Sequence, residues 1–442
     1  MASSYRAPAH PTSMRYLAAL LLVPSLLLNA KDIPVTDLVS LEAGMKMAAP
    51  GDRIVLREGV WENTVVKFQG QGTAAAPITL CAAVPGKTVF TGASGLRIAG
   101  EHLVVEGLWF KDPDSSIGDS IEFRVDSKRV AKHCRLTGCA ITMAPEVASK
   151  TDKESRWVGL YGSDNRVDRC LLQGKVTKGT TLVVWLGGLS TGRHIIEHNH
   201  FGPREKLGKN GGETIRVGDS KTSMETASCI IRQNLFEKCN GEAECISNKS
   251  CGNLYQENSF VEVSGTLTLR HGNGCTVEKN GFFGNGANGT GGIRLIGEDH
   301  VVKDNYLENL AGDDVRSGIT FMMGLPDSPA NGYFQVKRAR VENNTLVHCE
   351  HSILIGMEGD KVPGKPNLAP VDCVIRGNKI NSPKATVVEA RCDLAGVTWQ
   401  DNQFYGKELG LPETAGIAFG KEPVVEKLTP ISREAVGPSW WK

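Results

Sequence analysis

Two glutamates and a lysine stand close together in GEAECISNKS, residues 241–250. Carboxylates as close as those of Glu242 and Glu244 repel each other, so a positive group must compensate them or water must solvate them. On a strand whose side chains alternate, Ala243 and Cys245 point inward and both glutamates point outward. Ca²⁺ is a hard cation that prefers oxygen ligands, and we expect it to bridge this pair.

A third oxygen ligand is available in NGGETIR, which begins at Asn210. Gly211 and Gly212 allow the backbone to approach closely there, and the Asn210 amide oxygen would join the two carboxylates. This predicted ligand set, Asn210, Glu242 and Glu244, leaves coordination positions open for water or for a substrate carboxylate. The role of Glu213, in the same segment, stays open between metal contact, support of Arg216 and neither.

Lys249 follows the predicted metal ligands and is a candidate base. Nearby positive charge disfavours an ammonium ion, and a neutral amine can remove a proton. A cation that neutralises a carboxylate makes the proton alpha to it easier to remove and stabilises the enediolate-like charge. These parts match β-elimination from a uronic-acid polysaccharide, in which Lys249 takes the C5 proton and Arg270 or a water assists departure of O4.

The elements that must position these residues are repeats of one phrase: apolar or β-branched residues, two polar residues, then Asn. Examples are HIIEHNHF, CIIRQNLF and TVEKNGF. The period lies in the low twenties with insertions, which indicates stacked units that cannot bury a core alone. The phrase recurs at Asn199, Asn234, Asn258, Asn280, Asn305, Asn344, Asn378 and Asn402. Upstream, Gly107, Gly138 and Cys170 stand where Asn would be.

Short β-branched runs predict strands, and no amphipathic helix is predicted between the repeats. The pattern favours an all-β fold, a single-domain right-handed parallel β-helix over residues 31–442. Repeated Asn at one corner would form a ladder of amides between coils, since Asn tolerates the left-handed conformation of a tight corner. A β-propeller or a β-sandwich is the alternative, but the blades of a propeller need roughly forty or more residues each.

Strand alternation also predicts charged side chains on one outer face of the β-helix. In TIRV, TLTLR and GIRL the apolar residues point in, so Arg216, Arg270 and Arg294 point out. With Glu244 they follow each other at about one coil each, so we expect all four in one column. A solvated face of ion pairs is the alternative. Three arginines near paired glutamates instead favour a groove for an anionic chain, because the guanidinium fork suits carboxylates and sulfates.

Composition narrows the classes of function and the cellular location that the sequence allows. The chain has 442 residues and a net charge of +1, which argues against a general nucleic-acid binder. Residues 14–30 read MRYLAALLLVPSLLLNA, too short to span a membrane and typical of a signal peptide, so we expect residues 1–30 to direct secretion or periplasmic export.

Most of the twelve cysteines are expected to be small buried apolar residues, although Cys134/Cys139 and Cys239/Cys251 could be bridged.

The segments NGGETIRVG, EAECISNKSCGN, GTLTLRHGN and GGIRL together resemble polysaccharide lyase family 6, which contains alginate lyases and chondroitinase B. The resemblance implies a Ca²⁺-dependent parallel β-helix that cleaves uronate polysaccharides, with Lys249 as base and Arg270 as acid. It implies Asn210, Glu242 and Glu244 as calcium ligands. It also implies substrate-binding roles for Arg216, His271, Arg294 and Tyr333. Strict alternation would instead place His271 inward, as a core histidine.

Alginate is the expected substrate, and oligomeric state stays open. Dermatan or chondroitin sulfate is the nearest alternative and would call for extra basic residues such as Arg316 or Lys337–Arg338. A non-catalytic β-helix that binds acidic glycans is an alternative of another class. Glycoside hydrolysis would need a carboxylate pair acting as acid and base, whereas this pair stands beside Lys and Arg.

Overall fold

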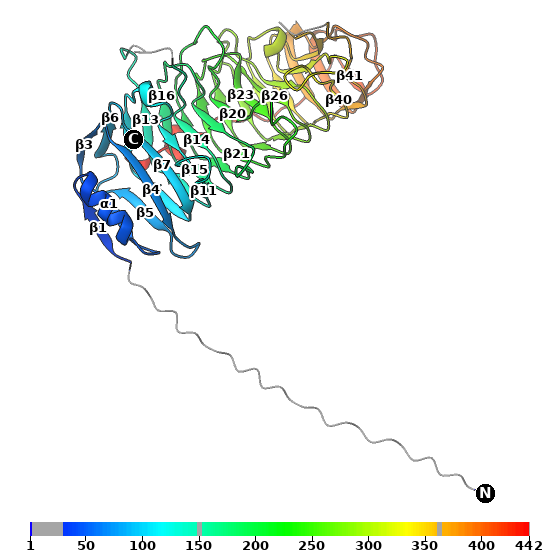
Figure 1. Ribbon diagram of the computed structural model, residues 1–442. Coiled ribbons are helices and arrows are strands. Elements are labelled where there is room, and N and C mark those ends of the chain that lie inside the picture. Colours follow the sequence, from blue (N-terminus) through cyan, green and yellow to red (C-terminus); the bar gives the residue numbers. More distant parts are fainter. Residues whose placement is uncertain (2–29, 148–152, 360–364, 442) are drawn as a thin grey trace.

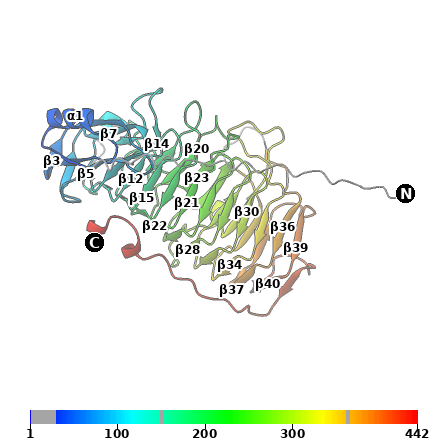
Figure 2. The same ribbon diagram turned by 90° about the horizontal axis from the view of Figure 1, so that it is seen from below.

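The computed structural model describes Met1 and residues 30–147, 153–359 and 365–441. The predicted signal peptide lies outside these residues apart from its two end positions. The described chain forms an elongated stack of coils with three parallel sheets (Figure 1, Figure 2). The predicted all-β parallel β-helix is therefore confirmed. None of the described helices is long and apolar enough to cross a membrane.

Most coils contribute one strand to each sheet, and all pairings between these strands are parallel; β10 and β11 of one coil both pair with β7. Sheet A has 14 strands: β1 (Asp32–Val35), β2 (Arg53–Leu56), β5 (Ile78–Ala82), β8 (Leu103–Glu106), β12 (Arg135–Thr137), β15 (Arg166–Asp168), β18 (Ile195–Glu197), β21 (Ile230–Arg232), β24 (Leu254–Gln256), β27 (Thr276–Glu278), β30 (Val301–Lys303), β33 (Arg340–Glu342), β36 (Cys373–Arg376) and β39 (Val397–Gln400). Sheet B has 14 strands: β3 (Gly59–Glu62), β6 (Thr88–Thr91), β9 (Trp109–Lys111), β13 (Ala140–Thr142), β16 (Leu171–Gln173), β19 (His200–Phe201), β22 (Leu235–Glu237), β25 (Ser259–Val261), β28 (Gly281–Phe283), β31 (Tyr306–Glu308), β34 (Thr345–Val347), β37 (Lys379–Thr386), β40 (Asn402–Glu408) and β41 (Ile417–Phe419). Sheet C has 13 strands: β4 (Val65–Gln71), β7 (Gly95–Glu101), β10 (Ile121–Glu122), β11 (Ala131–Lys132), β14 (Val158–Leu160), β17 (Leu182–Val184), β20 (Ile215–Gly218), β23 (Glu244–Lys249), β26 (Thr266–His271), β29 (Ile293–Leu295), β32 (Ile319–Met322), β35 (Ile353–Met357) and β38 (Val388–Ala390).

One α-helix, α1 (Leu38–Met47), packs on β1, β2 and β4 at the N-terminal end of the stack (Figure 1). It begins with a capping box, in which the Asp37 carboxylate accepts from the Ser40 N–H and the Ser40 hydroxyl accepts from the Asp37 N–H. Leu41 and Gly44 face the strands. The repeat pattern does not reveal this helix, because it precedes the repeats. Short 3₁₀ turns are η1 (Ser115–Ile117), η2 (Asp314–Arg316), η3 (Arg433–Ala435) and η4 (Ser439–Trp441).

The interior of the coils is aliphatic, with aromatic stacks that run along the axis. Phe201, Phe236, Phe260 and Phe282 follow one another with ring centroids 4.8, 4.7 and 4.5 Å apart. This spacing is the distance between adjacent strands, so each ring packs on its equivalent in the next coil. All twelve cysteines are free thiols and ten are buried, which confirms the expected apolar role. The Cys134/Cys139 and Cys239/Cys251 pairs are not bridged.

The asparagine ladder is present between sheets A and B. The Asn280 amide donates to Asn305 Oδ1 at 3.0 Å, and Asn280 Oδ1 accepts from the Asn258 amide at 2.9 Å. The same bonds connect all eight asparagines from Asn199 to Asn402. The expected left-handed conformation falls on the preceding residue instead, as at Lys279 with φ 54°. That residue turns the corner, so Asn can point its amide along the stack.

The C-terminal segment runs back along sheet B toward the first coils (Figure 2). The Arg433 guanidinium pairs with Glu237, and the Trp440 indole N–H donates to the Gly138 carbonyl at 2.7 Å. Trp441 packs edge-on against Trp109. Residues 420–441 thus tie late coils to early ones, a contact that the repeat pattern does not predict.

We expect Asn280→Ala to lower the free energy of unfolding by about 2–4 kcal/mol, because it leaves buried backbone and side-chain partners in two coils unsatisfied. Urea unfolding followed by circular dichroism measures this. The matched control is Gln403→Ala, since Gln403 also carries an amide but is exposed. Equal stability of the two variants would contradict a stabilising role for the ladder.

Candidate active site

The candidate site lies on the outer face of sheet C, over β20, β23, β26 and β29. Strand register places one residue of each strand in a row: Arg216, Ser247, Thr268 and Arg294. The predicted single column is therefore wrong for two of its members. Glu244 lies three residues before this row and Arg270 two residues after it. Both nevertheless reach the same place, because Glu244 pairs with Arg294 and lies 3.9 Å from Arg270 Nε.

Irregularities in the pairing of β23 with β26 cause this displacement. The register shifts between Glu244 and Ile246, and again between Asn248 and Lys249. After the second shift Lys249 pairs with His271, and Arg270 is the extra residue of the bulge. Such a bulge re-aims side chains, which strict alternation does not anticipate.

His271 is buried, as the core alternative predicts, but it lies in register with Lys249 under a loop from residues 331–334. Its Nε2 lies 2.9 Å from Arg270 Nη1, and its ring meets Phe334 edge-on. Burial, together with the charges of Arg270 and Lys249, lowers the pKa of His271 to about 3. His271 is therefore a neutral group at physiological pH.

The Arg270 guanidinium is held by the same loop. It donates to the Gly332 carbonyl at 2.6 Å and to the Asn331 carbonyl at 3.2 Å. It also packs on the Tyr333 ring, 4.2 Å from the centroid. Burial lowers the pKa of Arg270, while Glu244 opposes the change. Tyr333, predicted from a loop with little sequence signal, is thus brought into the site.

The two glutamates of the opening motif have different partners. Glu242 Oε2 accepts hydrogen bonds from the Gly211 and Gly212 N–H groups at 2.8 and 2.9 Å. Glu244 pairs with Arg294 and Ser247. Burial alone would raise the pKa of Glu244, but Arg294, Lys249 and Arg270 together lower it.

Glu242 carries charge that its protein partners do not fully compensate. Burial and the neighbouring carboxylates of Glu213 and Glu244 raise the pKa of Glu242 to about 7, against the backbone N–H groups that lower it. Glu213 is 4% exposed, and its Oε2 accepts no hydrogen bond from a described residue. This excess of buried oxygen charge fits a hard cation. Among the described residues, however, no three His, Cys, Asp or Glu side chains already converge to hold a metal ion.

Close backbone contact joins the two carboxylate segments. A Cβ on Gly212 would lie 2.3 Å from the Gly241 carbonyl oxygen, and one on Gly241 would lie 2.1 Å from the Gly212 carbonyl oxygen. Only glycine at both positions permits this approach. Asn210, the third predicted ligand, is exposed at the start of the first segment.

Arg204 supports these segments from below and was not identified from the sequence. Its Nη1 donates to the Glu213 carbonyl at 2.8 Å, and its Nη2 donates to the Gly179 carbonyl at 2.9 Å. Burial lowers the pKa of Arg204 to about 10, although Glu213 and Glu242 favour its charge. A second buried basic residue, Lys175, donates to the Thr177 carbonyl at 2.7 Å, and burial lowers the pKa of its amine well below the usual value. Neither residue belongs to a recognisable motif, so only packing reveals them.

Comparison with known proteins agrees with this geometry. A family profile described as Chondroitinase B matches residues 35–434. The solved structure of the PL6 family alginate lyase AlyGC has 39% identity over 93% of this chain, with a TM-score of 0.87. The chain belongs to polysaccharide lyase family 6.

Two other solved structures of family 6 match this chain over nearly their whole length. A mannuronic acid-specific family 6 lyase from human gut microbiota has 28% identity, a TM-score of 0.79, and coverage of 93% of this chain and 96% of its own. The lyase Pedsa3628 from Pseudopedobacter saltans has 26% identity and a TM-score of 0.76, with coverage of 92% and 99%. By contrast, this chain spans 59% of the length of AlyGC. A search of curated proteins gave no match.

Two of the three basic residues considered for sulfate recognition, Lys337 and Arg338, form ion pairs elsewhere. Arg338 pairs with Glu298 and Asp299, and Lys337 also pairs with Glu298. Arg316 lies in η2, and its buried Nε has no hydrogen-bond partner among the described residues.

We expect Arg204→Met to lower the free energy of unfolding by about 2–4 kcal/mol, because it leaves buried carbonyls unsatisfied and removes the cation beneath Glu213 and Glu242. Urea unfolding at pH 7.5 measures the change. Arg193→Met is the control, since Arg193 forms a surface pair with Asp164 that is worth about 0–1 kcal/mol. A loss no larger than that of the control would show that Arg204 does not support the site.

Proposed function

We propose that this protein is a polysaccharide lyase that cleaves alginate by β-elimination and leaves an unsaturated uronate end. The observation that carries the proposal is the meeting of Lys249, Arg270 and His271 on one face beside the glutamate pair. The similarity to alginate lyases supports the choice of substrate. We also expect export, as the N-terminal segment predicts.

Lys249 acts as the base that removes the C5 proton of the uronate. Within residues 30–147, 153–359 and 365–441 its amine is not engaged in a hydrogen bond or ion pair, so it is available to substrate. The charge of Glu244 lies close enough to interact with it. Neutral His271 lies in register with Lys249, so it can bind a sugar hydroxyl without adding a positive charge beside the base.

Arg270 acts on the leaving group. Its lowered pKa makes proton donation to the O4 oxygen less costly than for an exposed arginine. The carbonyls of residues 331 and 332 and the ring of Tyr333 hold its guanidinium in place, so little orientation is lost when substrate binds. Alternatively, Arg270 orients a water that performs the transfer.

A Ca²⁺ ion would be held by Asn210, Glu242 and Glu244, with Glu213 beside them. Its chemistry would be to neutralise the uronate carboxylate and so favour loss of the C5 proton. The unpartnered Glu213 oxygen and the raised pKa of Glu242 support this assignment. Arg216 on β20 and Arg294 on β29, at the two ends of one row across the site, then bind carboxylates of the chain, and Tyr333 contacts sugar.

We expect wild-type protein to produce unsaturated uronate from alginate, detected by ultraviolet absorbance, and EDTA to abolish the signal until Ca²⁺ is restored. Lys249→Ala should lower the rate by at least about 10³-fold through loss of the base. Lys303→Ala is the matched control, because Lys303 pairs with Glu278 on sheet A. Circular dichroism should show that both variants are folded.

Parallel incubations separate the alternatives. If product forms from dermatan sulfate and not from alginate, the substrate is the one that the Chondroitinase B profile suggests. New reducing ends without ultraviolet absorbance would indicate hydrolysis. Retained binding with no product would leave a glycan-binding protein. A near-normal rate for Lys249→Ala would contradict the assignment of the base.

A further inference from the structure

A second hollow lies on the same face of sheet C, toward the N-terminal coils from Arg216. It has a volume of about 730 Å³ and is lined by residues of the coils that carry β10, β14 and β17. Its walls include Arg124, Arg156, Tyr161 and Trp185. None of these residues belongs to the motifs from which the catalytic site was predicted.

Aromatic rings and guanidinium groups alternate from this hollow to the catalytic site. Trp185 lies 5.0 Å from the Arg216 guanidinium and 5.2 Å from that of Arg156. Tyr161 stacks on Trp185 with centroids 6.0 Å apart, and the Arg124 guanidinium lies 3.8 Å from the Tyr161 centroid. Trp185 therefore joins the hollow to a predicted substrate-binding arginine.

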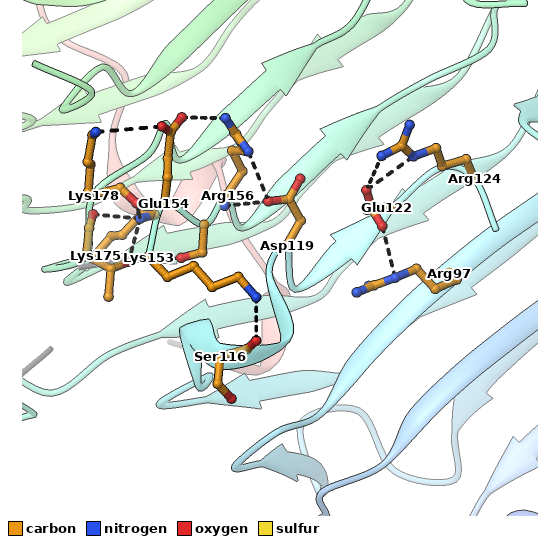
Figure 3. Close-up of polar contacts among 12 residues, drawn as sticks. Arg97, Ser116, Asp119, Glu122, Arg124, Lys153, Glu154, Arg156, Lys175 and Lys178 are labelled. Atoms are coloured by element: carbon orange, nitrogen blue, oxygen red, sulfur yellow. Dashed lines mark hydrogen bonds and ion pairs between the residues drawn. The ribbon is translucent and has the colours of Figure 1, made fainter. Parts of the chain in front are cut away.

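Carboxylates hold the guanidinium groups in position (Figure 3). Glu122 lies between Arg97 and Arg124, at 3.0 Å from each. Arg156 contacts both Glu154 and Asp119 (Figure 3). Because these charges largely offset one another, the hollow is suited to select a ligand by stacking and directed hydrogen bonds more than by net charge.

The distance from Lys249 to the far side of the hollow, measured along the axis of the β-helix, suits an extended chain. From β23, which carries Lys249, sheet C passes through β20, β17 and β14 to β10. Four steps of about 4.8 Å amount to roughly 19 Å, which is the length of several linked sugars rather than one. A ligand continuous from the catalytic site would therefore run over Arg216 and Trp185 into the hollow.

We propose that this hollow binds uronate units of the same polysaccharide chain, several residues away from the bond that is cleaved. Trp185 offers an apolar rim for a sugar ring, with the buried Tyr161 stacked behind it, and Arg124 and Arg156 offer N–H groups to hydroxyls and a carboxylate. The inference rests on the proposed function, because it takes the chain bound at Lys249 to continue into the hollow. It assigns a preference for long chains over short ones.

The test compares long alginate oligosaccharides with trisaccharides as substrates. Arg124→Ala removes donors from the hollow, and Leu189→Glu adds a negative charge at its rim, where Leu189 is 56% exposed and the fold should tolerate the change. Each should lower kcat/KM about tenfold on long chains and leave trisaccharide turnover unchanged. The controls are Arg376→Ala, whose partner Glu342 lies on sheet A, and Val424→Glu on the C-terminal segment.

Binding to the Lys249→Ala variant separates this inference from the lyase proposal. Long uronate oligosaccharides should bind it, and adding Arg124→Ala or Leu189→Glu should weaken binding about tenfold. If the oligosaccharides bind in this way but wild-type protein gives no turnover, the lyase chemistry would be overturned and the binding site would stand. Turnover by wild type, with both variants equal to the controls on long chains, would overturn the inference alone.

Discussion

Burying three carboxylates at the start of two adjacent strands, β20 and β23, is the constraint on which this site depends. The charges of Glu213 and Glu244 both act on Glu242, near the place where two coils touch through paired glycines. Arg294 and Arg270 compensate Glu244, and Arg204 lies beneath the other two. The remaining charge raises the pKa of Glu242 to about 7, so this group of carboxylates costs the fold some stability.

The solenoid supplies rigid support for this arrangement. The asparagine ladder and the phenylalanine stack fix the spacing between coils, so residues on successive strands of sheet C keep one geometry. Two irregularities in β23 then depart from the repeat. They bring Glu244, Lys249 and Arg270 together, which shows how a repetitive fold forms a unique site: the repeat positions the backbone, and the departures aim the side chains.

Local patterns in the sequence were sufficient to predict the ladder, the three-arginine face and the position of Lys249 close to Glu244. The register was not predictable, because a bulge leaves no mark in the alternation of TLTLRH. Arg204, Trp185 and the helix α1 were also missed. Arg204 acts through backbone carbonyls of distant residues. Trp185 is linked to the site only by its contact with Arg216 in the next coil. Such contacts depend on coil length, which insertions between the repeats obscure.

The most direct test of the account is calorimetric titration of the metal-free protein with Ca²⁺ near pH 7. The account predicts a single bound ion per chain, with release of protons because Glu242 is partly protonated before binding. Glu242→Gln should abolish both the binding and the proton release. No binding by the wild-type protein, or equal binding by Glu242→Gln, would contradict the claim that these carboxylates hold a cation beside Lys249.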